Sequence, residues 1–212
     1  MQLNQPFTVT AYRGVHGDPN VHPLETRLGC LSFSTPQVAQ MYATQPNCHQ
    51  DVVHTPRVVK AEINLNALAW YRPDDPFIDV KLLNAIFSDP QITWKLISPM
   101  AGHIANTDRG MEIIELYERP NDSIEDTLER LISNPRYQAA WEDLYLNAYL
   151  LLDRVEFVNA LMSLGYDGAV HAGSGLSMQQ PEYKVFEKCC VKITDTYFLH
   201  RAKSPIDTYT PM

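Results

Sequence analysis

The segment FTVTAYR, residues 7–13, decides the fold class of the amino-terminal part of the chain. Apolar and polar side chains alternate along it and several are β-branched, which is typical of a half-buried β-strand. Gly14 and the turn residues GDPN at 17–20 follow, so we expect the strand to end at Gly14. Residues 30–33 (CLSF) and 57–65 (RVVKAEINL) predict two further strands.

A helix is predicted directly after the second strand. Pro36 suits the first turn of a helix, and either Ser34 or Thr35 can serve as its N-cap. The apolar residues that follow recur at helical spacing; they are Val38, Ala39, Tyr42 and Ala43.

The middle of the chain, residues 67–164, is predicted to be a mostly helical insertion. Ser123 is the expected cap of one helix, Pro135 opens a second that continues to Leu152, and Asp153 leads a third. In each, apolar residues recur at spacings of three and four, which indicates one buried face. Residues 111–117 (MEIIELY) fit a strand or a helix.

Strands return near the carboxyl terminus. We expect strands at 168–171 and 182–186, and a hairpin over 190–199 that turns near Thr194 and Asp195. Residues 202–212 predict a loose tail. With strands at both ends and helices between them, the whole chain is expected to form one α+β domain.

Composition narrows the possible functions. The chain has 212 residues, of which 45% are hydrophobic and 20% are charged, as in a globular protein with a substantial core. The formal net charge of −8 argues against nonspecific binding to nucleic acid or to an anionic membrane, because both favour a basic surface. No signal peptide and no spanning apolar run are recognised, so we expect action in the cytoplasm, including that of a host cell.

The cysteines predict neither a disulfide framework nor a metal site. The four cysteines contain no CxxC pair, and Cys189 and Cys190 are adjacent, which suggests reduced thiols. Cys48, His49 and His54 do not form the well-spaced set of four ligands that zinc prefers. We therefore expect no metal.

Three short motifs lie at predicted strand ends. In residues 12–14 (YRG), Arg13 can present its guanidinium to a phosphate or carboxylate, although an exposed arginine that pairs with any nearby acid is the simpler interpretation. In residues 33–35 (FST), the hydroxyls satisfy helix capping or orient a nearby carboxylate, and the aromatic ring can flank a flat ligand.

The third motif is residues 180–182 (QPE). Glu182 opens a strand after a glycine-containing loop, where a carboxylate can bind a ribose hydroxyl and stabilise positive charge at the adjacent carbon. A surface glutamate at a strand edge is the alternative. Two other polar residues have simpler explanations: His16 fits a solvated loop, and turn chemistry explains Asp167.

Taken together, residues 12–14, 33–35 and 180–182 resemble the arginine–serine–glutamate class of mono-ADP-ribosyltransferases. That pattern comprises an aromatic–arginine strand, a Ser-Thr-Ser element before a helix, and Gln/Glu-x-Glu after a target-recognition loop. Pro36 replaces the last serine of the second element, so Ser32 is an alternative to Ser34 as the motif serine. Residues 165–168 (GYDG) also look like bacterial and phage members.

The resemblance implies a split β-sandwich around an NAD cleft. Arg13 would bind the pyrophosphate or a ribose hydroxyl, and Ser34 would hold Glu182 or the nicotinamide ribose. Phe33 and Tyr42 would flank the nicotinamide, and Gly14 and Thr35 would also belong to the cofactor-binding set. Glu182 would be the catalytic carboxylate, with Gln180, Arg13 and Ser34 as the other catalytic residues. NAD would serve as co-substrate.

The family comparison also suggests the acceptor and the partner. Gln180, in place of glutamate, favours a non-arginine acceptor such as asparagine. The loop at 172–179, and the helical insertion, would contact a target protein, such as a host or defence component if the protein is a phage or effector protein. An NAD glycohydrolase on the same fold and a catalytically inactive binding module remain alternatives.

Overall fold

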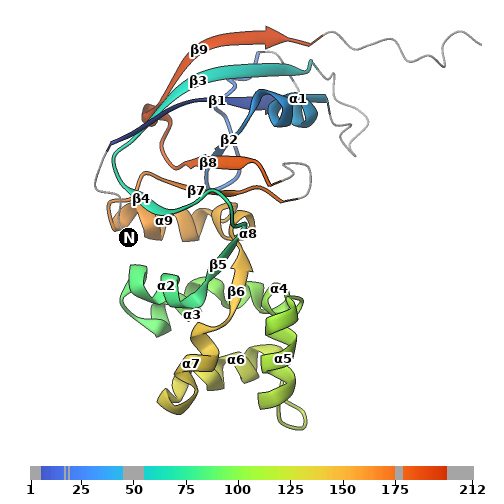
Figure 1. Cartoon of the computed structure of the whole chain (residues 1–212), viewed down its shortest axis with the longest axis vertical. Coiled ribbons are helices and arrows are strands. Elements are labelled where there is room, and N and C mark those ends of the chain that lie inside the picture. The colour runs from blue at the N-terminus through green and yellow to red at the C-terminus, as the bar shows by residue number, and fades with distance from the viewer. Residues whose placement is uncertain (1–5, 17, 19, 45–54, 175–178, 200–212) are drawn as a thin grey trace, which may run out of the picture.

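The fold is described from a computed structural model that covers residues 6–16, 18, 20–44, 55–174 and 179–199. Two β-sheets lie at one end of an elongated molecule and most of the helices lie at the other (Figure 1). The mixed architecture confirms the α+β class. Within the described ranges, no helix is long and apolar enough to cross a membrane.

The first sheet joins the two ends of the chain. Its strands run in the order β1 (Phe7–Val15), β3 (Arg57–Leu65) and β9 (Val191–Phe198), and both pairs are antiparallel. The predicted hairpin at 190–199 is wrong, because β9 is one continuous strand. Lys60 pairs with Asp195 and Ala61 with Ile193, so Thr194 is the extra residue of a β-bulge.

The second sheet has the order β2 (Leu31–Phe33), β8 (Pro181–Val185), β7 (Gly168–Ala172) and β4 (Leu68–Arg72). β2, β8 and β7 are antiparallel neighbours, whereas β4 is parallel to β7. The segment predicted to be helical from residue 67 therefore begins with a sheet strand, and the helices follow β4.

Helix α1 (Pro36–Thr44) packs on β1, and a glycine makes this contact possible. A Cβ atom at Gly14 would lie 2.1 Å from the carbonyl oxygen of Ala39, so only glycine fits beneath the helix. Gly14 does not end β1, which continues to Val15. Thr35 is the N-cap, since its Oγ1 accepts a hydrogen bond from the Val38 N–H at 3.4 Å.

The segment between β4 and β7 contains a short antiparallel β-ribbon and the remaining α-helices. The ribbon is β5 (Phe77–Asp79) and β6 (Tyr145–Asn147). The helices are α2 (Val80–Phe87), α3 (Pro90–Ile97), α4 (Ala101–Ala105), α5 (Asp108–Tyr117), α6 (Ile124–Ser133), α7 (Gln138–Glu142), α8 (Ala148–Leu152) and α9 (Val155–Ser163). Two 3-10 turns, η1 (Ser98–Met100) and η2 (Pro135–Tyr137), lie in this segment, and η4 (Lys188–Cys190) lies between β8 and β9.

Of two helix predictions in this segment, one is confirmed and the other is wrong. Ser123 caps α6 in a reciprocal capping box with Asp126, as predicted from the sequence. The single helix expected from Pro135 to Leu152 is wrong, because β6 interrupts it. Leu146 pairs with Ile78 in the ribbon, and burial of both side chains favours the strand there.

Two apolar cores share the second sheet. One lies between the sheets and includes Ala11, Phe33, Ile63, Leu65, Val170 and Val185. The other joins the helices to the opposite face of that sheet, and this one cluster includes Trp70 and Ala169 on the sheet and Leu128 and Leu151 on the helices. The second sheet thus positions residues on both of its faces, one toward each core.

Candidate functional site

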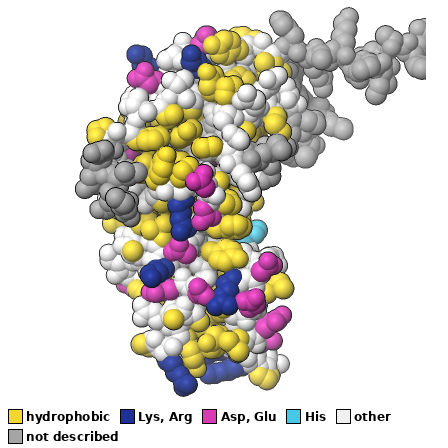
Figure 2. All heavy atoms as spheres, in the orientation of Figure 1, with side chains coloured by type: hydrophobic (Ala, Val, Ile, Leu, Met, Phe, Trp, Pro, Cys, Tyr) yellow, Lys and Arg dark blue, Asp and Glu magenta, His cyan; other side chains and the backbone are white. Residues whose placement is uncertain are grey.

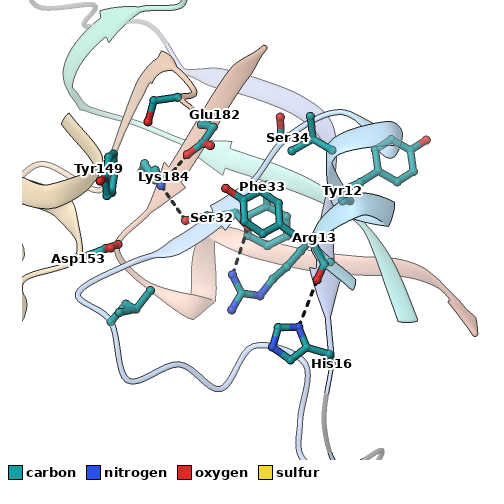
Figure 3. Close-up of a pocket in the computed structure, with 16 residues that line it drawn as sticks. Tyr12, Arg13, His16, Ser32, Phe33, Ser34, Tyr149, Asp153, Glu182 and Lys184 are labelled. Atoms are coloured by element: carbon teal, nitrogen blue, oxygen red, sulfur yellow. Dashed lines mark hydrogen bonds and ion pairs between the residues drawn. The ribbon is translucent and has the colours of Figure 1, made fainter. Parts of the chain in front are cut away.

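A cavity of ≈ 450 Å³ opens where the carboxyl-terminal half of β1 meets β2, α1, β8 and the end of α8 (Figure 3). Its volume falls in the range of about 300–1,000 Å³ that is usual for small-molecule and cofactor sites. Six of the sequence-predicted site residues line it: Arg13, Gly14, Phe33, Ser34, Tyr42 and Glu182.

The other two predicted residues lie elsewhere. Thr35 caps α1. The Gln180 side chain is exposed, and the main-chain carbonyl oxygen of Gln180 accepts a hydrogen bond from the Gly173 N–H at 2.8 Å. Neither belongs to the described residues that line the cavity.

Ser34 ties the two sheets together beside Glu182. The backbone of Ser34 exchanges hydrogen bonds of 2.8 and 2.9 Å with that of Tyr12, which connects β1 to the end of β2. The Ser34 hydroxyl donates a hydrogen bond of 2.8 Å to the carbonyl oxygen of Pro181. Ser34 therefore fixes the backbone immediately before Glu182.

Arg13 supplies a positive charge to the cavity. Its Nε donates to the carbonyl oxygen of Pro23 at 3.3 Å, and Nη1 donates to that of Ser32 at 3.2 Å. Burial lowers the pKa of Arg13, although a guanidinium stays protonated at neutral pH. In the described part of the chain no carboxylate forms an ion pair with Arg13, so its charge is available to an anionic ligand.

Glu182 forms a buried ion pair with a residue that the motifs did not identify. Lys184 Nζ lies 2.7 Å from Glu182 Oε2 and donates to the Ser32 hydroxyl at 2.9 Å (Figure 3). Burial lowers the pKa of Lys184, but attraction to Glu182, with smaller effects of Cys30 and Asp153, reverses this and leaves it raised. Alternation along β8 could have indicated that both side chains share a face.

His171 lies on β7 directly opposite Glu182. It is 1% exposed, and its Nδ1 lies 2.8 Å from the carbonyl oxygen of Ala172, which assigns the proton to Nδ1. Burial, together with the positive charge of Lys184, lowers the pKa of His171 to about 4. Without the strand register, nothing in the sequence connects His171 to the site.

The helical segment also contributes to the cavity. Tyr149 on α8 and Asp153, at its carboxyl end, line the side opposite Arg13 (Figure 3). The backbone of Asp153 is fixed because its carbonyl oxygen accepts from the Gly29 N–H at 3.0 Å. Burial raises the pKa of Asp153, against the opposing effect of Lys184.

The aromatic candidates differ in exposure. Phe33 is 1% exposed and packs largely in the core between the sheets, whereas Tyr42 is 37% exposed at the cavity. His16 lies at the same edge, with its Nδ1 3.3 Å from the Tyr42 carbonyl oxygen. Tyr42 is therefore the better-placed ring for contact with a planar ligand.

Asp167 has a larger role than its turn suggests. Its carboxylate accepts hydrogen bonds from the N–H groups of Asn66 at 2.6 Å and Ala67 at 3.0 Å, across about a hundred residues of chain. It therefore fixes the connection between β3 and β4 to the start of β7. Asp167 is a structural residue remote from the cavity-lining set.

The residues considered for a metal site and for the loose tail are not among those that the structure describes. Cys48, His49 and His54, like the tail at 202–212, lie outside the described residues. Ligand atoms of Glu187, Cys189 and Cys190 lie within 4.8 Å of one another at the surface. Structural zinc sites use four ligands but catalytic ones use three from the protein, so the expectation of no metal stays a prediction.

Comparison of the chain with protein-family models, curated proteins and solved structures gave no match. The chemistry of the cavity and the three sequence motifs are therefore the basis for inferring a function.

Proposed function

We propose that the protein is an NAD-dependent mono-ADP-ribosyltransferase that transfers ADP-ribose to a protein side chain. The observation that carries the proposal is that Arg13, Ser34 and Glu182, from three distant segments, line one cavity of suitable size. Chance surface residues would not be expected to converge in this way.

The charges of the cavity fit a dinucleotide substrate. Arg13 is suited to the pyrophosphate because a guanidinium binds phosphate oxygens through paired hydrogen bonds. Tyr42 offers an exposed ring to a base. Glu182 can accept a hydrogen bond from the ribose 2′-hydroxyl and stabilise the positive charge that develops at the anomeric carbon.

The proposed reaction is a substitution at that carbon. The bond to the nicotinamide nitrogen breaks, and its electron pair leaves with nicotinamide. The acceptor forms the new bond and releases its proton to a base or to solvent. Ser34 acts indirectly, by holding the Pro181 carbonyl and with it the start of β8.

We further infer that the two sheets form the split β-sandwich of this enzyme class. The Tyr12–Ser34 bridge, which joins the sheets beside the cavity, supports this assignment. The helical segment is then an insertion that forms one cavity wall through Tyr149 and Asp153. A target protein would approach near Gln180, whose exposed amide favours a neutral acceptor such as asparagine.

One observation favours a second function. Gln180 does not line the cavity, so water is a competing acceptor and NAD glycohydrolase activity is the alternative. The Lys184–Glu182 ion pair favours a third, an inactive binding module, because Lys184 offsets part of the carboxylate charge. A host-directed or effector role in a cytoplasm remains part of the first proposal.

The test is incubation with NAD carrying a labelled ADP-ribose, with and without candidate target proteins from a lysate. We expect nicotinamide release and labelled protein from the native chain, and at least about a hundredfold less from Glu182→Gln, since one lost electrostatic contact commonly costs this much. Arg13→Lys should weaken NAD binding. Glu129→Gln, an exposed carboxylate on α6, is the matched control and should retain activity.

Different products separate the candidates. Free ADP-ribose without labelled protein would replace the transferase with the glycohydrolase. If the chain does not consume NAD and NAD does not raise its melting temperature, the inactive binding module is the remaining candidate. Because Glu182→Gln removes the ion-pair partner of Lys184, the folded state of each variant is checked by circular dichroism before activities are compared.

A further inference from the structure

The most unusual feature of the cavity is a lysine buried among the residues proposed to carry out the reaction. Lys184 is 3% exposed, and its partner Glu182 is 6% exposed. Lysine is rarely buried, and an ion pair removed from water seldom adds stability over an apolar pair of the same size. The fold therefore maintains these charges at a cost that packing alone does not explain.

The backbone sets the position of Lys184 closely. Lys184 and Glu182 are two residues apart on β8, so their side chains project from the same face. Ser32 is the cross-strand neighbour of Lys184 on β2, and its hydroxyl accepts the 2.9 Å hydrogen bond from Nζ. With Nζ held by Ser32, the 2.7 Å contact also restrains the Glu182 carboxylate.

We propose that Lys184 is a positioning residue for Glu182, which it keeps ionised and oriented at the wall of the cavity. This inference rests on the proposed function. Burial by itself favours the neutral form of a carboxylate, which cannot stabilise developing positive charge. The nearby positive charge weakens the field of Glu182, but it secures the charged state on which the reaction depends.

Other ionisable groups surround the Lys184–Glu182 pair, and the test must be read at pH values where their own charges are known. They are Arg13 from β1, Cys30 before β2, His171 from β7, and Tyr149 and Asp153 from the α8 end. Burial raises the pKa of Cys30 to about 11, so the thiol is neutral at working pH. His171 is neutral above pH about 5, which leaves Glu182 and Asp153 as the acids to separate.

The experiment compares the native chain with Lys184→Met and Lys184→Arg. We expect the acidic limb of the kcat/KM profile to move upward by at least one pH unit in Lys184→Met, which corresponds to a loss approaching about tenfold at pH values below the native midpoint and recovers at higher pH. Lys184→Arg should restore the native profile. Lys192→Met, an exposed lysine on β9, is the matched control.

A carboxyl ¹³C NMR titration tests the inference without NAD. The Glu182 resonance is assigned by its loss in Glu182→Gln, and Asp153 is identified in the same way from Asp153→Asn. We expect Glu182 to stay ionised to below pH about 4.3, its ordinary midpoint, in the native chain and to titrate at least one unit higher in Lys184→Met.

The outcomes separate the two proposals. A native Glu182 midpoint at or above the ordinary value overturns the role of Lys184, even if Lys184→Met does not fold. A uniform loss of activity at every pH in Lys184→Met also overturns it, because that is the signature of a structural role. If the native chain does not consume NAD, the proposed function fails, and the titration still decides whether Lys184 controls Glu182.

Discussion

The sheet end and the helical end of the molecule bury different kinds of residue. Among the described residues, every buried Asp, Glu, Lys, Arg or His side chain lies on a strand of the two main sheets; these residues are Arg57, His171, Glu182 and Lys184. The buried polar residues of the helical segment are the neutral Thr93 and Thr127. The sheets thus hold charge in a dry environment, which helix packing in this chain avoids.

Most of the net negative charge of the chain lies instead in the helical segment. Residues 77–164 contain 14 acidic and 7 basic residues, so this segment carries −7 of the formal net charge of −8. On the face shown in Figure 2, acidic side chains recur around the middle and the helical end. The comparison suggests that the sheets carry the chemistry, while the helices supply an apolar core and a charged exterior. The following changes test that division.

The largest effect is expected from Leu131→Ala in α6. Leu131 is fully buried, and loss of a buried leucine costs about 2–5 kcal/mol of unfolding free energy. Its core continues to Trp70 on β4, so circular dichroism and tryptophan fluorescence should report one shifted urea transition. Leu116→Ala, at a site 72% exposed, should change stability by less than about 0.5 kcal/mol. Two separate transitions would show that the ends fold independently.

Gly14→Ala is expected to have the next largest effect. A Cβ there meets backbone atoms of α1, which cannot move aside without shifting the helix, so the cost is about 3 kcal/mol. NAD binding should weaken as well, because α1 forms part of the cavity wall. Gly102→Ala in α4 is the control: a Cβ meets nothing within 4 Å, and stability should rise by up to about 1 kcal/mol. Equal tolerance of both changes would contradict the packing explanation.

Protonation of buried His171 at acid pH should lower the stability of the protein. The folded protein resists protonating this residue, whose pKa is about 4, whereas an unfolded histidine titrates near about 6.5. The stability that His171 contributes is therefore complete above pH about 6.5 and declines as the pH falls toward 4, by about 2 kcal/mol at pH 5.

The measurement is urea unfolding at pH 7.5 and pH 5. His171→Leu should reduce the difference between the two values by about 2 kcal/mol, whatever its effect at pH 7.5. His103→Leu, which changes an exposed histidine on α4, should leave the difference unchanged. An unaltered pH dependence in His171→Leu would assign the acid sensitivity to other groups.

Local patterns predicted most strands and the motif residues, but long-range pairing determined the rest. Thr194 has turn chemistry, yet the partner strand β3 absorbs it as a bulge. Leu146 fits a helix by spacing, yet it pairs with Ile78. His171 lies opposite Glu182 only through strand register, and Asp153 lines the cavity only through helix placement. Lys184 is the exception, since alternation from Glu182 already puts both on one face.

Ser123→Ala should have the smallest effect and affect the helical end alone. The Ser123 hydroxyl accepts from the Asp126 N–H at 3.1 Å while the Asp126 carboxylate bonds back to Ser123, so the change removes one half of a capping box. We expect a loss of about 1 kcal/mol in urea unfolding. Ser133→Ala, at the other end of α6, is the matched control and should be neutral. NAD consumption should be the same for both variants, because α6 contributes no residue to the cavity lining among those described. A change in NAD consumption with Ser123→Ala alone would mean that the helical end controls the site, and the division between the two ends would not hold.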